Sequence, residues 1–360
     1  MIEHLRAEEL HGGYEAEAAA LDRVERTYDA IAELIGAGRD EIALVENATR
    51  AWDMAFYGFR FSPGDVVLVA RSEYASNSLA LQQVATRSGI VVETVADVVD
   101  GPAAGTADVA DLRRRLAGGG VALVAITHAP THNGLVNPAA EIGAACREFG
   151  VPFLLDACQS AGQLPLDVTE LGCDLLAATG RKWLRGPRGT GFLYVSRALA
   201  LDPPFVDLRA VTWPTPDAYL LRTDARRFEG FENNVAARIG LGVAVDYALA
   251  LGLGAIADRV GQLAETLRAG LARQPGCTVL DVGARRSGIV TFSVAGVEPA
   301  EVVAAASAVG VTINVATAAS ARYDVPGVRT RPVVRASPHY YNTADELDRL
   351  LASIPPPRTG

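Results

Sequence analysis

Residues 173–195 read CDLLAATGRKWLRGPRGTGFLYV, and this stretch decides how the chain around it is interpreted. Two apolar runs, each of strand length, flank a segment rich in glycine and basic residues. That segment holds Lys182, the only lysine in the chain, whereas every other Lys/Arg position is arginine. A guanidinium stays protonated, but a lysine amine can lose its proton and form a Schiff base with a carbonyl. Arginine-rich coding bias could also leave a single lysine, so the surrounding residues must decide between the two interpretations.

The composition is that of a globular, enzyme-sized protein. The 360 residues are 49% hydrophobic and 21% charged, with a net charge of −9, which argues against a nucleic-acid-binding surface. Arg238 and Asp246 interrupt the longest apolar stretch, 235–257, and no signal peptide opens the chain, so no membrane contact is expected. Four cysteines without metal-type or disulfide-type spacing indicate a reducing, cytoplasmic location and no metal site.

Strands and helices are predicted to alternate along the first half of the chain. The expected strands are 42–45, 66–70, 90–95, 121–127, 151–155, 174–179 and 190–195, and the expected helices are 21–35, one from Arg50, 76–88, 109–116 and 138–149. Several of these strands are continuous apolar runs, which is typical of a mostly parallel sheet covered by helices on both faces.

The second half predicts a smaller α/β layer. An irregular excursion, 201–234, precedes helices over 235–251 and up to Ala272. Beyond them we expect strands at 277–280, 289–294, 311–315 and 333–336, and helices at 299–309 and 343–353. The chain therefore divides into an N-terminal helical segment (1–40), a large domain (41–250) and a small C-terminal domain (251–360).

Polar residues gather where the predicted strands end. Glu46-Asn47, Ser72-Glu73, residues 128–131 and residues 156–159 each follow a strand. Since open parallel sheets bind ligands at the carboxyl ends of their strands, these clusters predict the site. A lone strand-end aspartate such as Asp156 commonly caps a loop. Beside the lysine segment, we interpret it instead as the partner of a protonated pyridine nitrogen, which makes the ring an electron sink.

The residues around Lys182 suit an anionic carbonyl cofactor. Thr179 and Arg181 can bind a phosphate group, and the glycines that follow allow the backbone to approach it closely. These groups together favour a catalytic role for Lys182 over a single lysine left by coding bias. They are a lysine, a hydroxyl, a guanidinium and a strand-end carboxylate.

This combination resembles a known family. The stretch from Cys173 to Lys182, followed by Gly189-Thr190-Gly191, is similar over its whole length to the lysine signature of the class V branch of fold-type I pyridoxal-phosphate enzymes. Cysteine desulfurases, epimerase-like proteins and C–S lyases belong to that branch. The resemblance extends from His4 to Ser353. It implies an α/β fold with a mostly parallel seven-stranded sheet between helices, a smaller C-terminal α/β domain, and pyridoxal 5'-phosphate as cofactor.

The resemblance also implies roles for single residues. Lys182 would bind the cofactor covalently and move the substrate α-proton, Asp156 would pair with the ring nitrogen, and Gln159 would reach the ring 3-oxygen. The other implied cofactor contacts are Ala48 and Thr49 in a phosphate turn at a helix start, Tyr74 where the desulfurases carry a stacking histidine, Thr131 near the ring oxygen, and Thr179 and Arg181 at the phosphate. Ordinary half-buried packing remains the alternative for Tyr74.

Two further matches concern substrate and assembly. Arg335 matches the arginine that binds the substrate carboxylate, although most arginines of this chain are expected to be solvated surface charge. Residues 228–234, which include Asn233, resemble the loop that enters the active site of the neighbouring subunit. The resemblance therefore implies a homodimer with shared active sites and a small amino-acid substrate.

One departure from the family narrows the expected reaction. The desulfurases carry a persulfide-forming cysteine shortly before the carboxylate-binding arginine, whereas residues 316–333 contain Thr317, Ser320 and Tyr323 but no cysteine. Cys158 lies in the cofactor segment and is interpreted as a small buried residue.

We therefore expect C–S β-elimination from a cysteine S-conjugate in secondary sulfur metabolism. Class V transamination, epimerisation, and a decarboxylating or oxidative reaction on a related amino acid are the alternatives. A non-catalytic scaffold protein is the competing class, and the joint presence of Lys182, Asp156 and Gln159 argues against it.

Overall fold

A seven-stranded sheet forms the centre of the molecule, for which a computed structural model describes residues 1–317, 319, 323 and 332–358. The strand order is β1-β7-β6-β5-β4-β2-β3. The five strands from β6 to β3 run parallel, and β7 is antiparallel to both β6 and β1. The strands are β1 (Ile42–Val45), β2 (Val66–Val69), β3 (Val91–Thr94), β4 (Val121–Thr127), β5 (Phe153–Asp156), β6 (Leu175–Thr179) and β7 (Gly191–Val195). The predicted fold class is confirmed.

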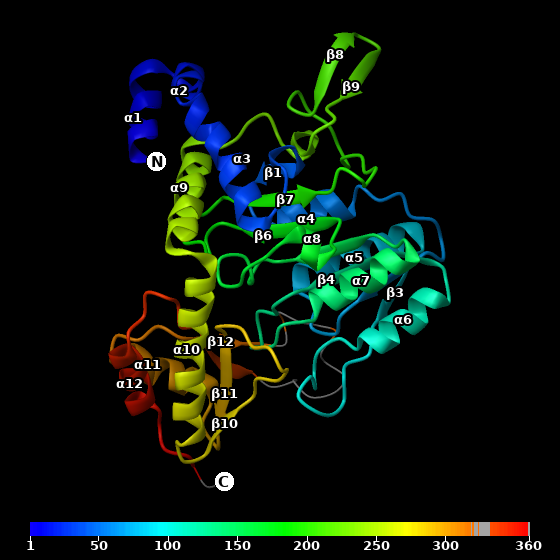
Figure 1. The fold of residues 1–360 in the computed structure, drawn as a ribbon. Coiled ribbons are helices and arrows are strands. Elements are labelled where there is room, and N and C mark those ends of the chain that lie inside the picture. Colours follow the sequence, from blue (N-terminus) through cyan, green and yellow to red (C-terminus); the bar gives the residue numbers. More distant parts are fainter. Residues whose placement is uncertain (318, 320–322, 324–331, 359–360) are drawn as a thin grey trace.

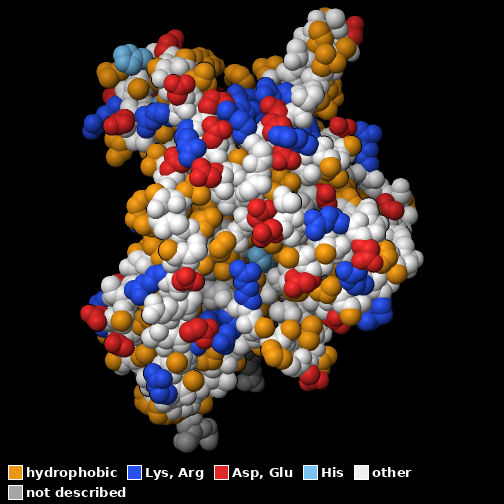
Figure 2. Space-filling view, viewed as in Figure 1, with side chains coloured by type: hydrophobic (Ala, Val, Ile, Leu, Met, Phe, Trp, Pro, Cys, Tyr) orange, Lys and Arg blue, Asp and Glu red, His pale blue; other side chains and the backbone are white. Residues whose placement is uncertain are grey.

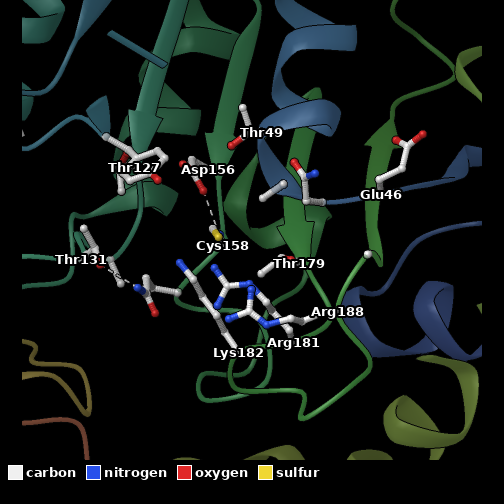
Figure 3. Close-up of a pocket in the computed structure, with 16 residues that line it drawn as sticks. Glu46, Thr49, Thr127, Thr131, Asp156, Cys158, Thr179, Arg181, Lys182 and Arg188 are labelled. Atoms are coloured by element: carbon white, nitrogen blue, oxygen red, sulfur yellow. Dashed lines mark hydrogen bonds between the residues drawn. The ribbon is translucent and has the colours of Figure 1, made fainter. Parts of the chain in front are cut away.

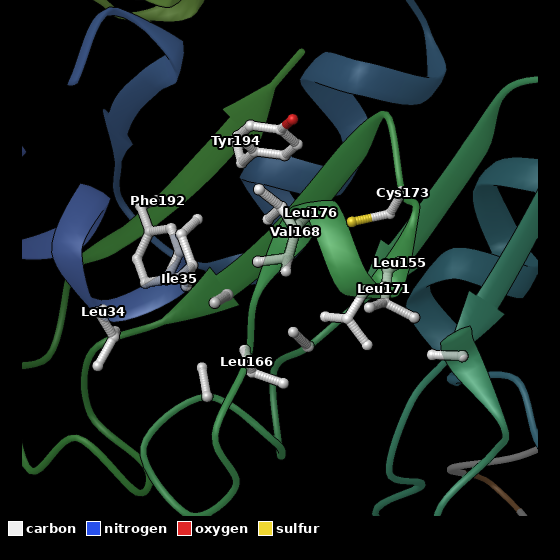
Figure 4. Packing of buried hydrophobic residues seen from close by; sticks show 14 of the residues in the cluster. Leu34, Ile35, Leu155, Leu166, Val168, Leu171, Cys173, Leu176, Phe192 and Tyr194 are labelled. Atoms are coloured by element: carbon white, nitrogen blue, oxygen red, sulfur yellow. The ribbon is translucent and has the colours of Figure 1, made fainter. Parts of the chain in front are cut away.

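Both faces of this sheet are covered, which explains the continuous apolar runs. Along β1, Leu44 packs in one apolar cluster and its neighbour Ala43 in the other, and the same alternation recurs on the central strands. One cluster lies beneath α3 (Leu21–Ile35), α6 (Val109–Ala117), α7 (Ala139–Phe149), α8 (Val168–Leu171) and α9 (Val235–Leu251). Figure 4 shows Leu34 and Ile35 of α3 in this layer, with Phe192 of β7. The other lies beneath α4 (Ala48–Phe56) and α5 (Ala75–Ser88).

A smaller antiparallel sheet follows the long helices. Its order is β10-β11-β13-β12, and its strands are β10 (Cys277–Val279), β11 (Val290–Val294), β12 (Asn314–Ala316) and β13 (Val333–Ala336). The helices α10 (Leu253–Ala272), α11 (Pro299–Ala308) and α12 (Ala344–Ser353) pack on it around a separate apolar core. Figure 1 shows α9 beside the large sheet and α10 beside the small one. The structure thus places β13, and with it Arg335, within reach of the large sheet.

The excursion 201–234 is more regular than the sequence predicts. It contains a hairpin, β8 (Val211–Thr215) and β9 (Ala218–Leu221), and a 3-10 turn, η2 (Ala225–Phe228). The hairpin projects from the body (Figures 1 and 2). Its side chains Trp213, Tyr219 and Leu220 are exposed. Pro214 within β8 and the short pairing mask the alternation from which a strand is predicted. The prediction of an irregular segment was wrong here.

The ends of the chain complete the fold. Two short helices, α1 (Ile2–His11) and α2 (Gly13–Ala19), precede α3, and a 3-10 turn, η1 (Arg39–Glu41), leads into β1. In the described part of the chain, no single helix meets the length and hydropathy needed to span a bilayer. Only the pair α9 and α10, bent by 81° where they meet, satisfies those limits together.

Candidate active site

A cavity of about 460 Å³ opens where the central strands end. It is lined by most of the residues singled out from the sequence, namely Ala48, Thr49, Tyr74, Thr131, Asp156, Gln159, Thr179, Arg181 and Lys182. Figure 3 shows six of them, Thr49, Thr131, Asp156, Thr179, Arg181 and Lys182, gathered around the cavity. Members of three of the four strand-end clusters line this cavity, whereas Ser72 and Glu73 do not. The physical basis of this gathering is the parallel order of β4, β5 and β6, which brings the carboxyl ends of these strands to one edge.

Lys182 lies in the connection between two neighbouring antiparallel strands, β6 and β7. The Gly180 N–H donates to the Thr190 carbonyl at 2.9 Å, which closes this connection at its base. A Cβ at Gly180 would come within 2.3 Å of Thr190 Oγ1, so a side chain there would push the two ends apart. Figure 3 shows the Lys182 side chain pointing into the cavity, close to Cys158. Burial raises the pKa of the Cys158 thiol, an effect that the charge of Lys182 opposes.

Asp156 ends β5 and is almost fully buried. Its Oδ1 accepts a hydrogen bond from the Cys158 N–H at 2.8 Å, and its Oδ2 accepts one from Asn77 Nδ2 at 2.9 Å. Burial raises the pKa of this carboxyl, whereas these donors and the nearby Lys182 lower it. Because Asp156 lines the cavity and has a defined orientation, its carboxylate can accept a hydrogen bond from a protonated ring nitrogen.

Another part of the cavity lining suits a phosphate. Ala48 and Thr49 begin α4, where first-turn N–H groups have no partner within the helix. Arg181 and Arg188 also line this cavity, and neither guanidinium has a carboxylate within salt-bridge distance among residues 1–317, 319, 323 and 332–358. Two guanidinium groups beside a helix start fit a dianion. The residues present therefore fit pyridoxal phosphate, with an amine for its aldehyde, a carboxylate for its ring nitrogen and cations for its phosphate.

A hydrogen-bonded chain joins the cavity to the small sheet. Gln159 Nε2 and Arg335 Nη1 both donate to Thr131 Oγ1, at 2.9 and 2.8 Å respectively. Trp183 Nε1 donates to Gln159 Oε1 at 3.1 Å and so fixes the direction of the Gln159 amide. Burial lowers the pKa of Arg335. Arg335 of β13 therefore reaches the lining residue Thr131 but does not itself line the cavity, and its role at a substrate carboxylate stays a prediction.

Two of the predicted cofactor contacts need separate comment. Tyr74 lines the cavity at the start of α5 and is half-buried. Asn233 does not reach the cavity within the chain. It lies in a different hollow, with Tyr14 of α2 and Arg209, and its side chain donates to the Phe231 carbonyl at 2.9 Å. The structure of one chain therefore does not bring Asn233 together with Lys182.

Some residues at the site were not given a role from the sequence. Arg188 was read only as part of the glycine-rich stretch, and Asn77 was not singled out. The signal for Asn77 is its spacing of four residues from Glu73 at a helix start, which places both on one side of the turn. In the described ranges, no group of three His, Cys, Asp or Glu side chains could hold a metal ion.

Comparisons with known proteins agree with this geometry. A family model described as aminotransferase class-V matches residues 2–350. The chain is 32% identical to a "Probable cysteine desulfurase" of Xylella fastidiosa, over 93% of this chain and 80% of that relative. It is also 32% identical to a "Probable hercynylcysteine sulfoxide lyase" of Mycobacterium tuberculosis, over 98% of this chain and 84% of that relative.

Solved structures give the same result. The cystine C–S lyase C-DES, in complex with its reaction product cysteine persulfide, matches with a TM-score of 0.87 at 26% identity. The match covers 98% of this chain and 91% of that one. A variant of C-DES with glycine covalently linked to its pyridoxal-phosphate cofactor matches with a TM-score of 0.86 at 26% identity, over 98% of this chain and 90% of that one.

Proposed function

The chain belongs to the class V aminotransferase family and is a pyridoxal-phosphate-dependent enzyme, and we propose that it cleaves the C–S bond of a cysteine S-conjugate by β-elimination. The products would be a thiol, pyruvate and ammonia. Two named relatives support a sulfur-containing substrate, because one is a sulfoxide lyase and one a cystine C–S lyase. A place in secondary sulfur metabolism is part of this proposal.

The observation that carries the proposal is the absence of a cysteine between Ala316 and Arg335 in the sequence. A desulfurase that forms a persulfide needs a thiol at the mouth of its site to accept the sulfur. Most of this stretch, including Ser320, lies outside the described residues, so the argument rests on the sequence alone. Cys158 is half-buried and lines the cavity, but it lies directly after β5 beside Asp156 and not in the stretch where the desulfurases carry their acceptor thiol.

The residues of the chain would divide the work as follows. Pyridoxal phosphate, when bound, withdraws electrons from the α-carbon of an amino acid. Lys182 Nζ would hold the cofactor and then take the proton from the substrate α-carbon. Asp156 would keep the ring nitrogen protonated, and Gln159 would contact the ring oxygen. Arg335 would orient the substrate by its carboxylate, so that the C–S bond is placed for cleavage.

The phosphate would be held by the helix start and the basic side chains. Ala48 and Thr49 would donate backbone N–H groups from α4, and Thr179 and Arg181 would contact the phosphate oxygens. Tyr74 would pack on the ring. We further propose a homodimer, in which the segment carrying Asn233 reaches the cavity of the neighbouring subunit, since it does not reach its own.

The test is to incubate the holoenzyme with a panel of cysteine conjugates and amino acids and to identify the products by mass spectrometry. Release of pyruvate and a free thiol in equal amounts is the expected result. A keto acid that keeps the full substrate skeleton would establish transamination instead, and recovery of the inverted amino acid would establish epimerisation.

Lys182→Arg provides the control at the catalytic position. Arginine keeps the positive charge but cannot form the covalent bond, so this variant should lose the visible absorbance of the bound cofactor and all turnover. Turnover that survives this substitution would contradict the role proposed for Lys182.

A further inference from the structure

A second carboxylate lies buried behind Asp156. Glu73 follows β2 and its side chain is fully buried, with no exposed area. Its oxygens accept hydrogen bonds from Thr127 Oγ1 at 2.6 Å, from the Thr127 N–H at 3.1 Å and from the Tyr74 N–H at 3.0 Å. A buried carboxyl with this many donors has one fixed orientation. Glu73 does not line the cavity, and nothing in the proposed reaction requires it.

Asn77 joins this carboxylate to Asp156. Its Nδ2 donates to Glu73 Oε1 at 2.7 Å and to Asp156 Oδ2 at 2.9 Å, so a single amide group bridges the two carboxyls. The Asn77 side chain is itself buried at 1% exposure, where water cannot replace it. The orientation of Asp156 therefore depends on an amide whose position is set by Glu73.

The two carboxyls also influence each other electrostatically. Burial and the neighbouring Asp156 raise the pKa of Glu73 to about 7, against the opposing effect of its hydrogen-bond donors. The other titratable groups around the pair are Tyr323, whose pKa is raised by burial and by Glu73, and Lys182 and Cys158 on the cavity side of Asp156. Next to Thr127, His128 is neutral, because burial lowers its pKa to about 3.

We propose that Glu73, acting through the Asn77 amide, is a positioning residue that sets the orientation and the proton affinity of Asp156. This inference rests on the proposed placement of Asp156 at the ring nitrogen of the cofactor and is independent of which bond the enzyme cleaves. Above neutral pH a negative charge on Glu73 strengthens the hold of Asp156 on the ring-nitrogen proton. Loss of the Asn77 donor removes a group that stabilises the Asp156 anion, which also makes that anion more basic.

The two substitutions Glu73→Gln and Asn77→Leu separate this role from a merely structural one. The readout is the protonation of the ring nitrogen, followed by nitrogen-15 NMR of the holoenzyme loaded with labelled cofactor over a range of pH. Glu73→Gln should shift the titration of the ring nitrogen to lower pH, by about one unit, and Asn77→Leu should shift it to higher pH.

Asp281→Asn is the matched control. Asp281 is another buried carboxylate, and its Oδ1 accepts hydrogen bonds from the Thr291 N–H at 2.9 Å and from Thr291 Oγ1 at 2.6 Å. It follows β10 of the small sheet and does not line the Lys182 cavity. This variant should lose stability without moving the ring-nitrogen titration.

Two outcomes would overturn the proposal, and they differ. If Asp156→Asn leaves the ring-nitrogen signal unchanged, the premise that Asp156 faces the ring nitrogen is wrong. A second result would leave Asp156 at the ring nitrogen but remove the positioning role of Glu73. In that case Asp156→Asn changes the signal, whereas Glu73→Gln and Asn77→Leu shift the titration in the same direction or not at all. If only one of Glu73→Gln and Asn77→Leu folds, the direction of its own shift tests the positioning role of Glu73.

Discussion

Glu229 is the centre of a buried network that fixes the segment leading to Asn233. Its side chain has no exposed area, and it accepts hydrogen bonds from Tyr28 Oη at 2.8 Å, from the Leu44 N–H at 2.9 Å and from Arg238 Nη1 at 3.2 Å. These partners belong to α3, β1 and α9, so a single carboxylate ties three elements together. We predict that Glu229→Gln lowers the free energy of unfolding strongly.

The magnitude follows from which contacts the amide can keep. Glutamine can still accept from Tyr28 and Leu44, but the charge that balances Arg238 is lost, and Arg238 is only 10% exposed. Removing one partner of a buried ion pair costs about 3–5 kcal/mol. Arg238 retains its 3.1 Å bond to the Leu44 carbonyl, so we expect a loss near about 3 kcal/mol, the lower end of that range.

The assay is guanidinium chloride unfolding of the holoenzyme at fixed protein and cofactor concentrations, with the slope of the transition checked for constancy. Asp40→Asn is the matched control, because it breaks an Arg–carboxylate pair in which Arg197 is 64% and Asp40 43% exposed. Exposed pairs add little, so no measurable change is expected there. A loss in Glu229→Gln no larger than in Asp40→Asn would refute the reasoning. Replacing Arg238 by methionine in the same variant should recover part of the loss.

Three further predictions concern the core and the site. The pKa of Glu73 is raised from 4.5 to about 7, so between these pH values the folded state keeps a proton that the unfolded chain has released. The free energy of unfolding should therefore fall by about 3 kcal/mol as the pH rises from 4.5 to 7. Melts of Glu73→Gln should not show this dependence on pH. Gly143→Ala would place a Cβ 2.0 Å from the Leu171 carbonyl oxygen and should cost about 1–3 kcal/mol or more in a thermal melt, whereas Gly261→Ala, with no atom within 4 Å of its Cβ, should be neutral or stabilising. Arg335→Gln should lower kcat/KM about tenfold to a hundredfold while the cofactor absorbance is kept; a loss of cofactor instead would contradict its assignment to the substrate.

The sheet and most of the cavity could be predicted from the sequence because their signals are local. A continuous apolar run identifies a covered strand, and the polar residue that follows it marks the edge where ligands bind. Asp156 and Lys182 satisfy both conditions, and they meet in the structure. Arg335 could be placed only through its resemblance to a family motif, since nothing in its local pattern predicts that β13 lies beside Thr131.

What could not be predicted depends on tertiary contacts. Asn77 looks like an ordinary polar residue of a helix, and only the fold, which brings the start of α5 to the end of β5, makes it a hydrogen-bond partner of Asp156. The hairpin of β8 and β9 escaped prediction because its strands are short, exposed and interrupted by Pro214. For Asn233 the sequence implies a site in another subunit, and a single chain leaves that as a prediction.

The placement of Lys182 between β6 and β7 has a consequence for the order in which the site assembles. These strands pair directly with each other, Thr179 opposite Gly191, so ordering the lysine requires closure of only a short loop. The bond between Asn77 and Asp156 joins residues 79 positions apart and needs β2, β4 and β5 already aligned. Short closures form sooner than long ones during folding. The reactive amine is therefore expected to reach its place early, while the carboxylate that would hold the ring nitrogen is among the last parts of the site to be completed.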